Sequence, residues 1–175
     1  MKVIITDSNF KSDEPERNVL EKVGLSVTRF QCKTVEEMIE VGQDADAVFV
    51  QFAPVTEQVL KAWSNCKIIV RYGIGYDNVD VQSATKLGIQ VCNVPSYCLD
   101  EVADHTCALL LASLRKVVLL HESVQAGGWE VENVAKPMKG FANTSIGLIG
   151  FGRIGMKVSD RLRAFGFKLM VYDPY

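Results

Sequence analysis

Residues 146–155 read Ile-Gly-Leu-Ile-Gly-Phe-Gly-Arg-Ile-Gly, and this stretch decides the fold of the chain. It predicts an apolar strand that runs into a G-x-G-x-x-G turn and then into an amphipathic helix with Gly166 as its stop. A second strand over 167–172 follows and ends at Asp173, about 20 positions after the middle glycine. Strand, glycine turn, helix, strand and terminal acid in this order predict the opening unit of a dinucleotide-binding fold.

The three glycines of the motif have separate physical roles. Gly150 lets the chain turn out of the strand, Gly152 lets the backbone approach a pyrophosphate, and Gly155 lets the helix pack closely on the strand. The free N–H groups at the helix start face the phosphates, and a carboxylate at position 173 accepts ribose hydroxyls and repels a 2′-phosphate, which favours NAD over NADP. The alternative interpretation is a tight strand-to-helix turn without a ligand. The predicted cofactor-binding residues are Gly150, Phe151, Gly152, Arg153, Ile154, Gly155 and Asp173.

Composition narrows the class of protein. The formal net charge is −2, so nothing predicts a nucleic-acid partner or binding to an anionic membrane surface. The longest apolar region, 107–120, is too short and too charged to span a bilayer. The sequence leads directly into a strand, so we expect no signal peptide.

Cysteine and histidine usage argues against a disulfide framework and against a metal site. The five cysteines are an odd number without a C-x-x-C spacing, which predicts reduced thiols in a cytoplasmic protein. A reactive cysteine is the alternative to buried structural thiols. His105 and His121 are too far apart to form a helical metal pair, so no metal site is predicted.

The first half of the chain alternates short apolar strands with amphipathic helices. This alternation predicts a parallel sheet covered by helices on both faces, in a small flavodoxin-like α/β domain over residues 1–97. The expected strands are 2–6, 25–30, 47–50, 67–70 and 90–92, and the expected helices are 15–23, 34–41, 56–63 and 81–87.

The pattern changes after residue 97. A long helix is expected over 100–125, because apolar residues recur at helical spacing and two glycines at 127–128 end the pattern. An irregular stretch over 129–143 then leads to the glycine-rich strand. We therefore expect a second domain over 98–175, which contains a linking helix and the first strand–helix–strand unit of a Rossmann NAD-binding domain.

Four ordered motifs resemble those of the D-2-hydroxyacid dehydrogenases, the family that includes D-3-phosphoglycerate dehydrogenase. They are Val-Arg-Tyr-Gly-Ile-Gly-Tyr-Asp-Asn at 70–78, Val-Cys-Asn-Val-Pro at 91–95, Glu-Val-Ala-Asp-His-Thr at 101–106, and the glycine motif through Asp-Pro-Tyr at 173–175. The resemblance covers the chain from about residue 67 to its end and, more loosely, the part before it. It implies an NAD-dependent oxidoreductase that interconverts a D-2-hydroxy acid and a 2-keto acid by hydride transfer.

The resemblance also implies a substrate site in the first of these motifs. The turn Gly73-Ile74-Gly75 would offer backbone N–H groups to the substrate carboxylate. Arg71 would add a charge-assisted contact, and its alternative is a surface ion pair with an aspartate of the following loop. Thr106 matches a position that contacts the cofactor, and its alternative is a hydroxyl that bonds its own helix backbone.

In this family an arginine, a glutamate and a histidine carry out the hydride-transfer chemistry, and all three would lie beyond Tyr175. Arg115, His121 and Glu122 do not match those motifs, so no catalytic residue is expected in this chain. The resemblance therefore implies an N-terminal fragment of a homodimeric enzyme. One alternative is an NAD-binding protein of the C-terminal-binding corepressor type, which Arg71 and the last four residues resemble. Another is an inactive short product that only associates with a partner.

Overall fold

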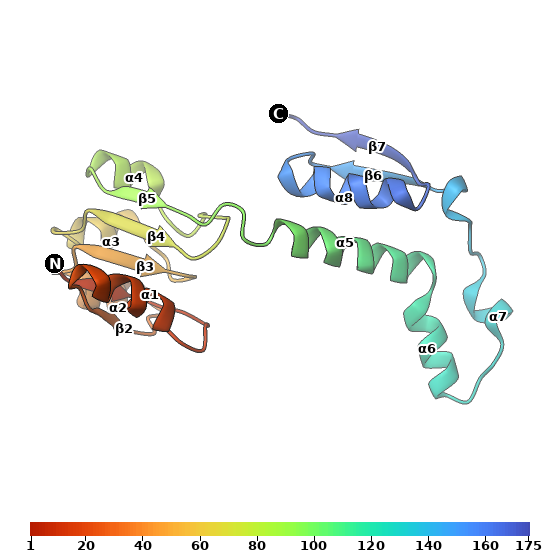
Figure 1. The fold of residues 1–175 in the computed structure, drawn as a ribbon, viewed down its shortest axis with the longest axis horizontal. Helices are drawn as coiled ribbons and strands as arrows, with labels where there is room; N and C mark the ends of the chain where they lie inside the picture. Colours follow the sequence, from red (N-terminus) through yellow and green to blue (C-terminus); the bar gives the residue numbers. More distant parts are fainter. The chain divides into compact units, whose positions relative to one another are not determined.

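The computed structural model describes residues 1–175, and the chain divides into two compact units, Met1–Tyr97 and Cys98–Tyr175. Each unit has its own hydrophobic core. Figure 1 colours the first unit from red to yellow-green and the second from green to blue.

The first unit is built on a five-stranded sheet in which every neighbouring pair is parallel. Its spatial order is β2-β1-β3-β4-β5, which is the flavodoxin-like order, so the predicted flavodoxin-like sheet is confirmed. In this order the sheet has a switch point between β1 and β3, and ligands of such sheets collect outside the carboxyl ends of the strands. The strands are β1 (Val3–Ile5), β2 (Val27–Arg29), β3 (Ala47–Val50), β4 (Ile68–Arg71) and β5 (Gln90–Cys92).

Short capped helices connect these strands. The Thr34 side chain forms a capping box with Glu37 at the start of α2, and the Asp80 carboxylate accepts from the Ser83 N–H at 2.9 Å at the start of α4. The helices are α1 (Glu14–Leu20), η1 (Glu21–Val23), α2 (Val35–Gly42), α3 (Glu57–Ala62) and α4 (Val81–Lys86). Side chains of α2, α3 and α4 join the main core, whereas α1 packs on a smaller apolar cluster on the other face.

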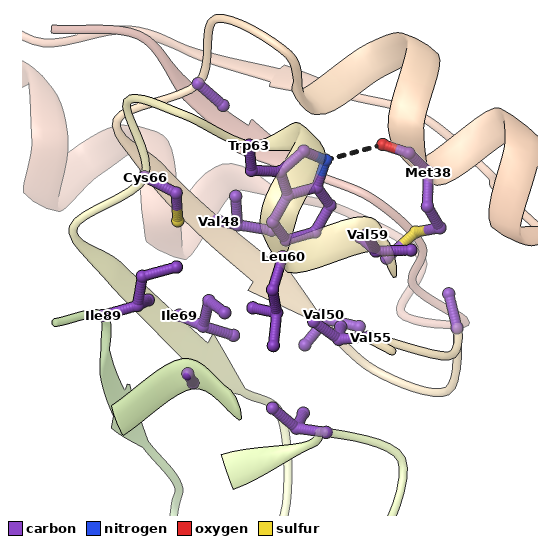
Figure 2. Close-up of a cluster of buried hydrophobic side chains, with 14 of the residues drawn as sticks. Met38, Val48, Val50, Val55, Val59, Leu60, Trp63, Cys66, Ile69 and Ile89 are labelled. Atoms are coloured by element: carbon purple, nitrogen blue, oxygen red, sulfur yellow. Dashed lines mark hydrogen bonds between the residues drawn. The ribbon is translucent and has the colours of Figure 1, made fainter. Parts of the chain in front are cut away.

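Trp63 is the largest fully buried side chain of the main core. Figure 2 shows its ring among side chains of β3, α3 and β4, and its indole Nε1 donates to the Met38 carbonyl at 2.8 Å. The ring also explains why position 42 is a glycine, because a Cβ there would lie 2.1 Å from the indole nitrogen. The indole N–H is satisfied, as a buried tryptophan requires.

The second unit contains the predicted glycine-motif unit. Strands β6 (Ser145–Ile149) and β7 (Lys168–Tyr172) pair in parallel, and α8 (Arg153–Ala164) connects them, so the expected strand–helix–strand arrangement is confirmed (Figure 1). The chain leaves α8 through Gly166 at φ 78°. The other elements are α5 (Leu99–Leu114), α6 (Val117–Gln125), α7 (Val131–Ala135) and η2 (Phe141–Asn143).

Helices α5 and α8 pack together to form the core of the second unit. Ala103 and Cys107 of α5 are buried against Val158 and Leu162 of α8, and Phe167 completes the cluster. The other face of the two-stranded sheet is exposed, with Ile149 at 89% exposure. A strand–helix–strand piece therefore covers one face of its sheet and leaves the other open, as its size predicts.

An ion-pair network joins the same two helices along their edge. The Asp100 carboxylate lies 2.8 Å from the Lys157 ammonium and 2.9 Å from the Arg161 guanidinium, which also contacts Asp104. The hydrogen bond from Lys157, followed by that from Arg161, lowers the pKa of Asp100 below its usual value. These charges lie at the solvent-exposed edge, so we expect the network to contribute little to stability.

Two expectations for the second unit are wrong in detail. The long helix predicted over 100–125 is broken at Lys116, which adopts a left-handed conformation (φ 55°) between α5 and α6. Helical periodicity continues across the break, so the apolar pattern does not reveal it. The stretch over 129–143, expected to be irregular, contains α7 and η2. None of the helices combines the length and the apolar composition that a transmembrane span requires.

Candidate functional site

The turn after β4 lies at the carboxyl edge of the first unit's sheet. Gly73 adopts φ 147°, a conformation that side chains rarely tolerate, and a Cβ there would lie 1.7 Å from Nη1 of Arg71. The guanidinium therefore lies directly across the Gly73 backbone. The Arg71 Nε is buried without a hydrogen-bond partner. None of the ion pairs of the structure joins Arg71 to an aspartate of the following loop.

Two backbone N–H groups of this turn remain available. The N–H of Gly73 donates to the Arg71 carbonyl at 2.9 Å, but those of Ile74 and Gly75 donate to no acceptor within the chain. The turn itself is fixed, because the Asn93 side chain donates to the Ile74 carbonyl at 2.7 Å. The structure thus brings the four predicted substrate residues together around two free donors of the kind that bind a carboxylate.

Sequence reasoning missed the residues that hold this edge of the sheet. Asp7 follows β1 and accepts from three consecutive backbone N–H groups of the turn after β3. Asn78 donates from Nδ2 to the Ala53 carbonyl at 3.0 Å, which ties that turn to the loop after β4. An acidic residue directly after an apolar strand is the one signal in the sequence that points to Asp7, and it does not reveal the partner of the carboxylate.

The glycine turn of the second unit has the geometry that its motif predicts. Gly150 has φ 90°, and a Cβ on Gly155 would lie 2.5 Å from the Gly150 carbonyl oxygen, so the helix start packs directly on the turn. A Cβ on Gly152 would meet no atom within 4 Å. The backbone at Gly152 therefore faces open space.

Asp173 lies at the end of β7 beside the same turn. Its carboxylate accepts from the N–H groups of Tyr175 at 3.0 Å and Phe151 at 2.5 Å, and these bonds lower its pKa below the usual value. The Gly150 N–H donates to the Tyr172 carbonyl at 2.8 Å, which joins β7 to the turn. The acid is thus ionised at neutral pH and is held next to the helix start.

These residues fit a dinucleotide. No side chain caps the start of α8, so the N–H groups at Gly152, Arg153 and Ile154 are available to a pyrophosphate. The open space at Gly152 allows the phosphates to approach, and the Asp173 carboxylate beside it is a hydrogen-bond acceptor suited to ribose hydroxyls.

Other polar residues singled out in the sequence lie elsewhere. The Thr106 hydroxyl donates to the Val102 carbonyl at 2.7 Å within α5, which is the alternative considered for it, and its oxygen keeps acceptor capacity. His105 and His121 are exposed on α5 and α6. No group of three or more histidine, cysteine or acidic residues is arranged to hold a metal ion.

Comparison with known proteins gives one family. The family model described as D-isomer specific 2-hydroxyacid dehydrogenase, catalytic domain, matches residues 3–165. The chain is 39% identical over 142 residues to a hydroxypyruvate reductase of Thermotoga maritima, covering 79% of the chain and 45% of that relative. It is 36% identical to a D-3-phosphoglycerate dehydrogenase of Methanocaldococcus jannaschii in an alignment that covers 100% of this chain and 32% of that relative. The chain thus spans less than half the length of either relative.

Solved structures share the fold. A 3-phosphoglycerate dehydrogenase of Entamoeba histolytica with bound NAD⁺ superposes with a TM-score of 0.77 at 29% identity, over 99% of this chain and 54% of that one.

Proposed function

The chain belongs to the D-isomer specific 2-hydroxyacid dehydrogenases, and we propose that it supplies the substrate-binding unit, residues 1–97, and the first part of the cofactor-binding unit, residues 98–175, of such an enzyme. The enzyme would interconvert a D-2-hydroxy acid and a 2-keto acid with NAD. NAD, when bound, supplies the hydride acceptor. The residues of this chain bind and orient the two reactants.

One observation carries the substrate assignment, namely the two free N–H groups of Ile74 and Gly75 at the carboxyl edge of the sheet. A carboxylate that accepts from both would lie beside Arg71, whose guanidinium crosses Gly73. A cation and two free amides in one turn favour a carboxylate-bearing substrate over a neutral one.

The glycine turn supports NAD as the cofactor. Gly152 leaves room for phosphates, Gly155 brings the helix start onto the turn, and Asp173 beside the turn would accept hydrogen bonds from ribose hydroxyls. Thr106 belongs to the same proposed site as a cofactor contact from α5 that uses its free acceptor capacity.

Replacement of Asp173 tests the choice of cofactor in the complete enzyme, meaning this chain together with the rest of the cofactor-binding unit. The unmodified enzyme should bind NAD more tightly than NADP, because the carboxylate repels a 2′-phosphate. Asp173→Ala should weaken NAD binding and reduce the preference, as measured by calorimetric titration with both cofactors. Equal affinity of the unmodified enzyme for the two cofactors would contradict the assignment.

Turnover tests the proposed activity. The complete enzyme should oxidise NADH with 2-keto acids, and hydroxypyruvate is a suitable first substrate because a relative at 39% identity is named as its reductase. The 175-residue chain alone should show no turnover, because the general acid/base of the reaction would lie outside it. Turnover by a 175-residue chain of verified mass would direct attention to its two histidines.

A second candidate function is NAD binding without catalysis, as in a corepressor. Arg71 and the Tyr-Asp-Pro-Tyr sequence at 172–175 favour it. A complete protein that binds NADH tightly but reduces no 2-keto acid would support this alternative over the enzyme.

We also propose a homodimer in the cytoplasm. The exposed apolar residues of α5, α6 and the segment after them support self-association, with Trp129 at 84% exposure and a hollow of about 370 Å³ between the helices. All five cysteines are free thiols, which is typical of proteins in a reducing compartment. The hollow is lined by Leu109, Ala112, Ser113, Lys116, Val118 and Leu119.

A further inference from the structure

Asp7 is the one acidic residue among the buried polar side chains, with 3% of its surface exposed. One oxygen of its carboxylate accepts from the Gln51 N–H at 3.1 Å, and the other accepts from Phe52 at 2.6 Å and Ala53 at 3.2 Å. Three consecutive amides that converge on one anion form a backbone nest of the kind that elsewhere binds free anions. Here the chain fills the nest with its own carboxylate.

The filled nest lies between the switch point of the sheet and the proposed substrate turn. Asp7 follows β1 and the nest follows β3, and these two strands flank the switch point. Beyond the nest, the Ala53 carbonyl accepts from the Asn78 side-chain amide at 3.0 Å. The Val55 N–H donates to the Asn78 carbonyl at 2.8 Å. The carboxylate is thus two hydrogen bonds away from the loop that carries the free N–H groups.

We propose that Asp7 is a positioning residue of the substrate site. Its charge fixes the turn after β3 against the loop after β4, and it leaves the N–H groups of Ile74 and Gly75 as the amide site open to a substrate carboxylate. The role rests on the proposed function, since it assumes that this sheet edge binds the substrate.

The negative charge is specific to this role. An asparagine has a single carbonyl oxygen, and its NH₂ group would face N–H donors, so it satisfies fewer of the three amides. A buried N–H without an acceptor is unfavourable, and the turn would move to find another partner. The loop beyond Asn78 would follow this movement.

Asp46 provides a matched control at the opposite edge of the same sheet. Its carboxylate also accepts from a backbone amide, that of Lys2 at 2.7 Å, but it lies at the amino end of β3. Asp46→Asn therefore weakens a comparable bond of the same unit and leaves the carboxyl edge unchanged.

Hydrogen exchange on the 175-residue chain tests the positioning directly. In Asp7→Asn, the amides of Gln51, Phe52 and Ala53 should exchange at least about tenfold faster than in the unmodified chain. Asp46→Asn should leave these three amides unchanged. Equal exchange at the turn in Asp7→Asn and in the unmodified chain would overturn the proposal.

Kinetics of the complete enzyme separate positioning from stability. Asp7→Asn should raise the KM for the 2-keto acid about tenfold, with kcat and NADH affinity nearly unchanged, and Asp46→Asn should leave the KM unchanged. Asn78→Ala, which removes the tie to Ala53 but keeps Asp7, should raise the KM in the same direction. If the KM of Asp7→Asn and that of Asn78→Ala are both no higher than the KM of Asp46→Asn, the positioning role of Asp7 is refuted. An unmodified enzyme without keto-acid reduction would refute the proposed function instead, and hydrogen exchange would still decide whether Asp7 fixes the turn.

Discussion

Gly152 and Gly155 lie in the same turn, but the space around them predicts different results for the same substitution. A Cβ on Gly155 would lie 2.5 Å from the Gly150 carbonyl oxygen, so Gly155→Ala should lower the free energy of unfolding by about 1–3 kcal/mol. A Cβ on Gly152 meets open space, so Gly152→Ala should mainly block the phosphates and weaken NAD binding by roughly tenfold to a hundredfold. Thermal unfolding and calorimetric titration measure the two effects. Loss of stability without loss of NAD affinity in Gly152→Ala would contradict this division.

Gly75 is exposed in the turn after β4, and a Cβ there would lie 3.3 Å from an oxygen of Asp77. In the complete enzyme, Gly75→Val should raise the KM for the 2-keto acid roughly tenfold to a hundredfold, because the valine side chain would cover the N–H groups that we propose as the carboxylate site. NAD affinity should stay near normal. Gly140→Val is the control, since that glycine lies in the second unit with no atom within 4 Å of its Cβ. A lower melting temperature with an unchanged KM would remove Gly75 from the site.

At the scale of single residues, local motifs could be predicted from the sequence, whereas tertiary contacts could not. The glycine turn and the acid at the strand end are local patterns, and the structure places Asp173 beside the turn as their spacing predicts. The partner of Asp7 lies more than forty positions away, and no local pattern specifies it. The packing of Arg71 across Gly73 depends on a side-chain conformation that periodicity does not determine.

At the scale of elements, the contact between α5 and α8 leads to a prediction about pH. The pKa of Asp100 is lowered by Lys157 and Arg161, so the folded state binds this proton more weakly than the unfolded state. The contribution is fully present above the unfolded pKa, about 3.9, and is lost as the pH falls through the lower folded value. Asp100→Asn should therefore reduce the acid-induced loss of stability, as measured by denaturant unfolding between neutral pH and about pH 3.

Asp160→Asn serves as the control for this prediction, because Asp160 is exposed on α8 outside the network. High salt should reduce the difference between Asp100→Asn and the unmodified chain at neutral pH, because it screens exposed charges. An identical pH dependence in the two variants would show that the network contributes nothing measurable.

The helix positions of the first unit and the parallel pairing of its strands were predictable together, because a parallel sheet requires a crossover between neighbouring strands. The break at Lys116 could not be predicted in this way, because a residue in the left-handed region leaves the apolar spacing of the flanking helices intact. The sequence at the break is Lys116-Val117-Val118, and it contains neither glycine nor proline, the strong signals for the end of a helix.

At the scale of the whole molecule, the exposed apolar surface of α5 and α6 leads to a prediction about assembly. Val118 is 61% exposed beside a hollow that Leu109 and Leu119 also line, and monomeric proteins rarely leave such residues clustered. Val118→Asp should convert a dimer to a monomer, because a carboxylate buried at an interface without a partner opposes association.

Val19→Asp is a matched control for the assembly experiment, since Val19 is 63% exposed on α1 of the first unit, far along the sequence from these helices. Sedimentation equilibrium should give a dimer for the unmodified protein and for Val19→Asp, and a monomer for Val118→Asp. Val118 lies on α6, which contacts α5, and α5 carries Ala103 and Cys107 into the core. The far-UV circular dichroism of Val118→Asp must therefore remain that of the folded chain, so that loss of the dimer is not caused by unfolding. A monomeric unmodified protein would exclude self-association. A Val118→Asp variant that is as dimeric as the control would place the dimer interface on another surface. In either case the apolar face of α5 and α6 would need a different partner.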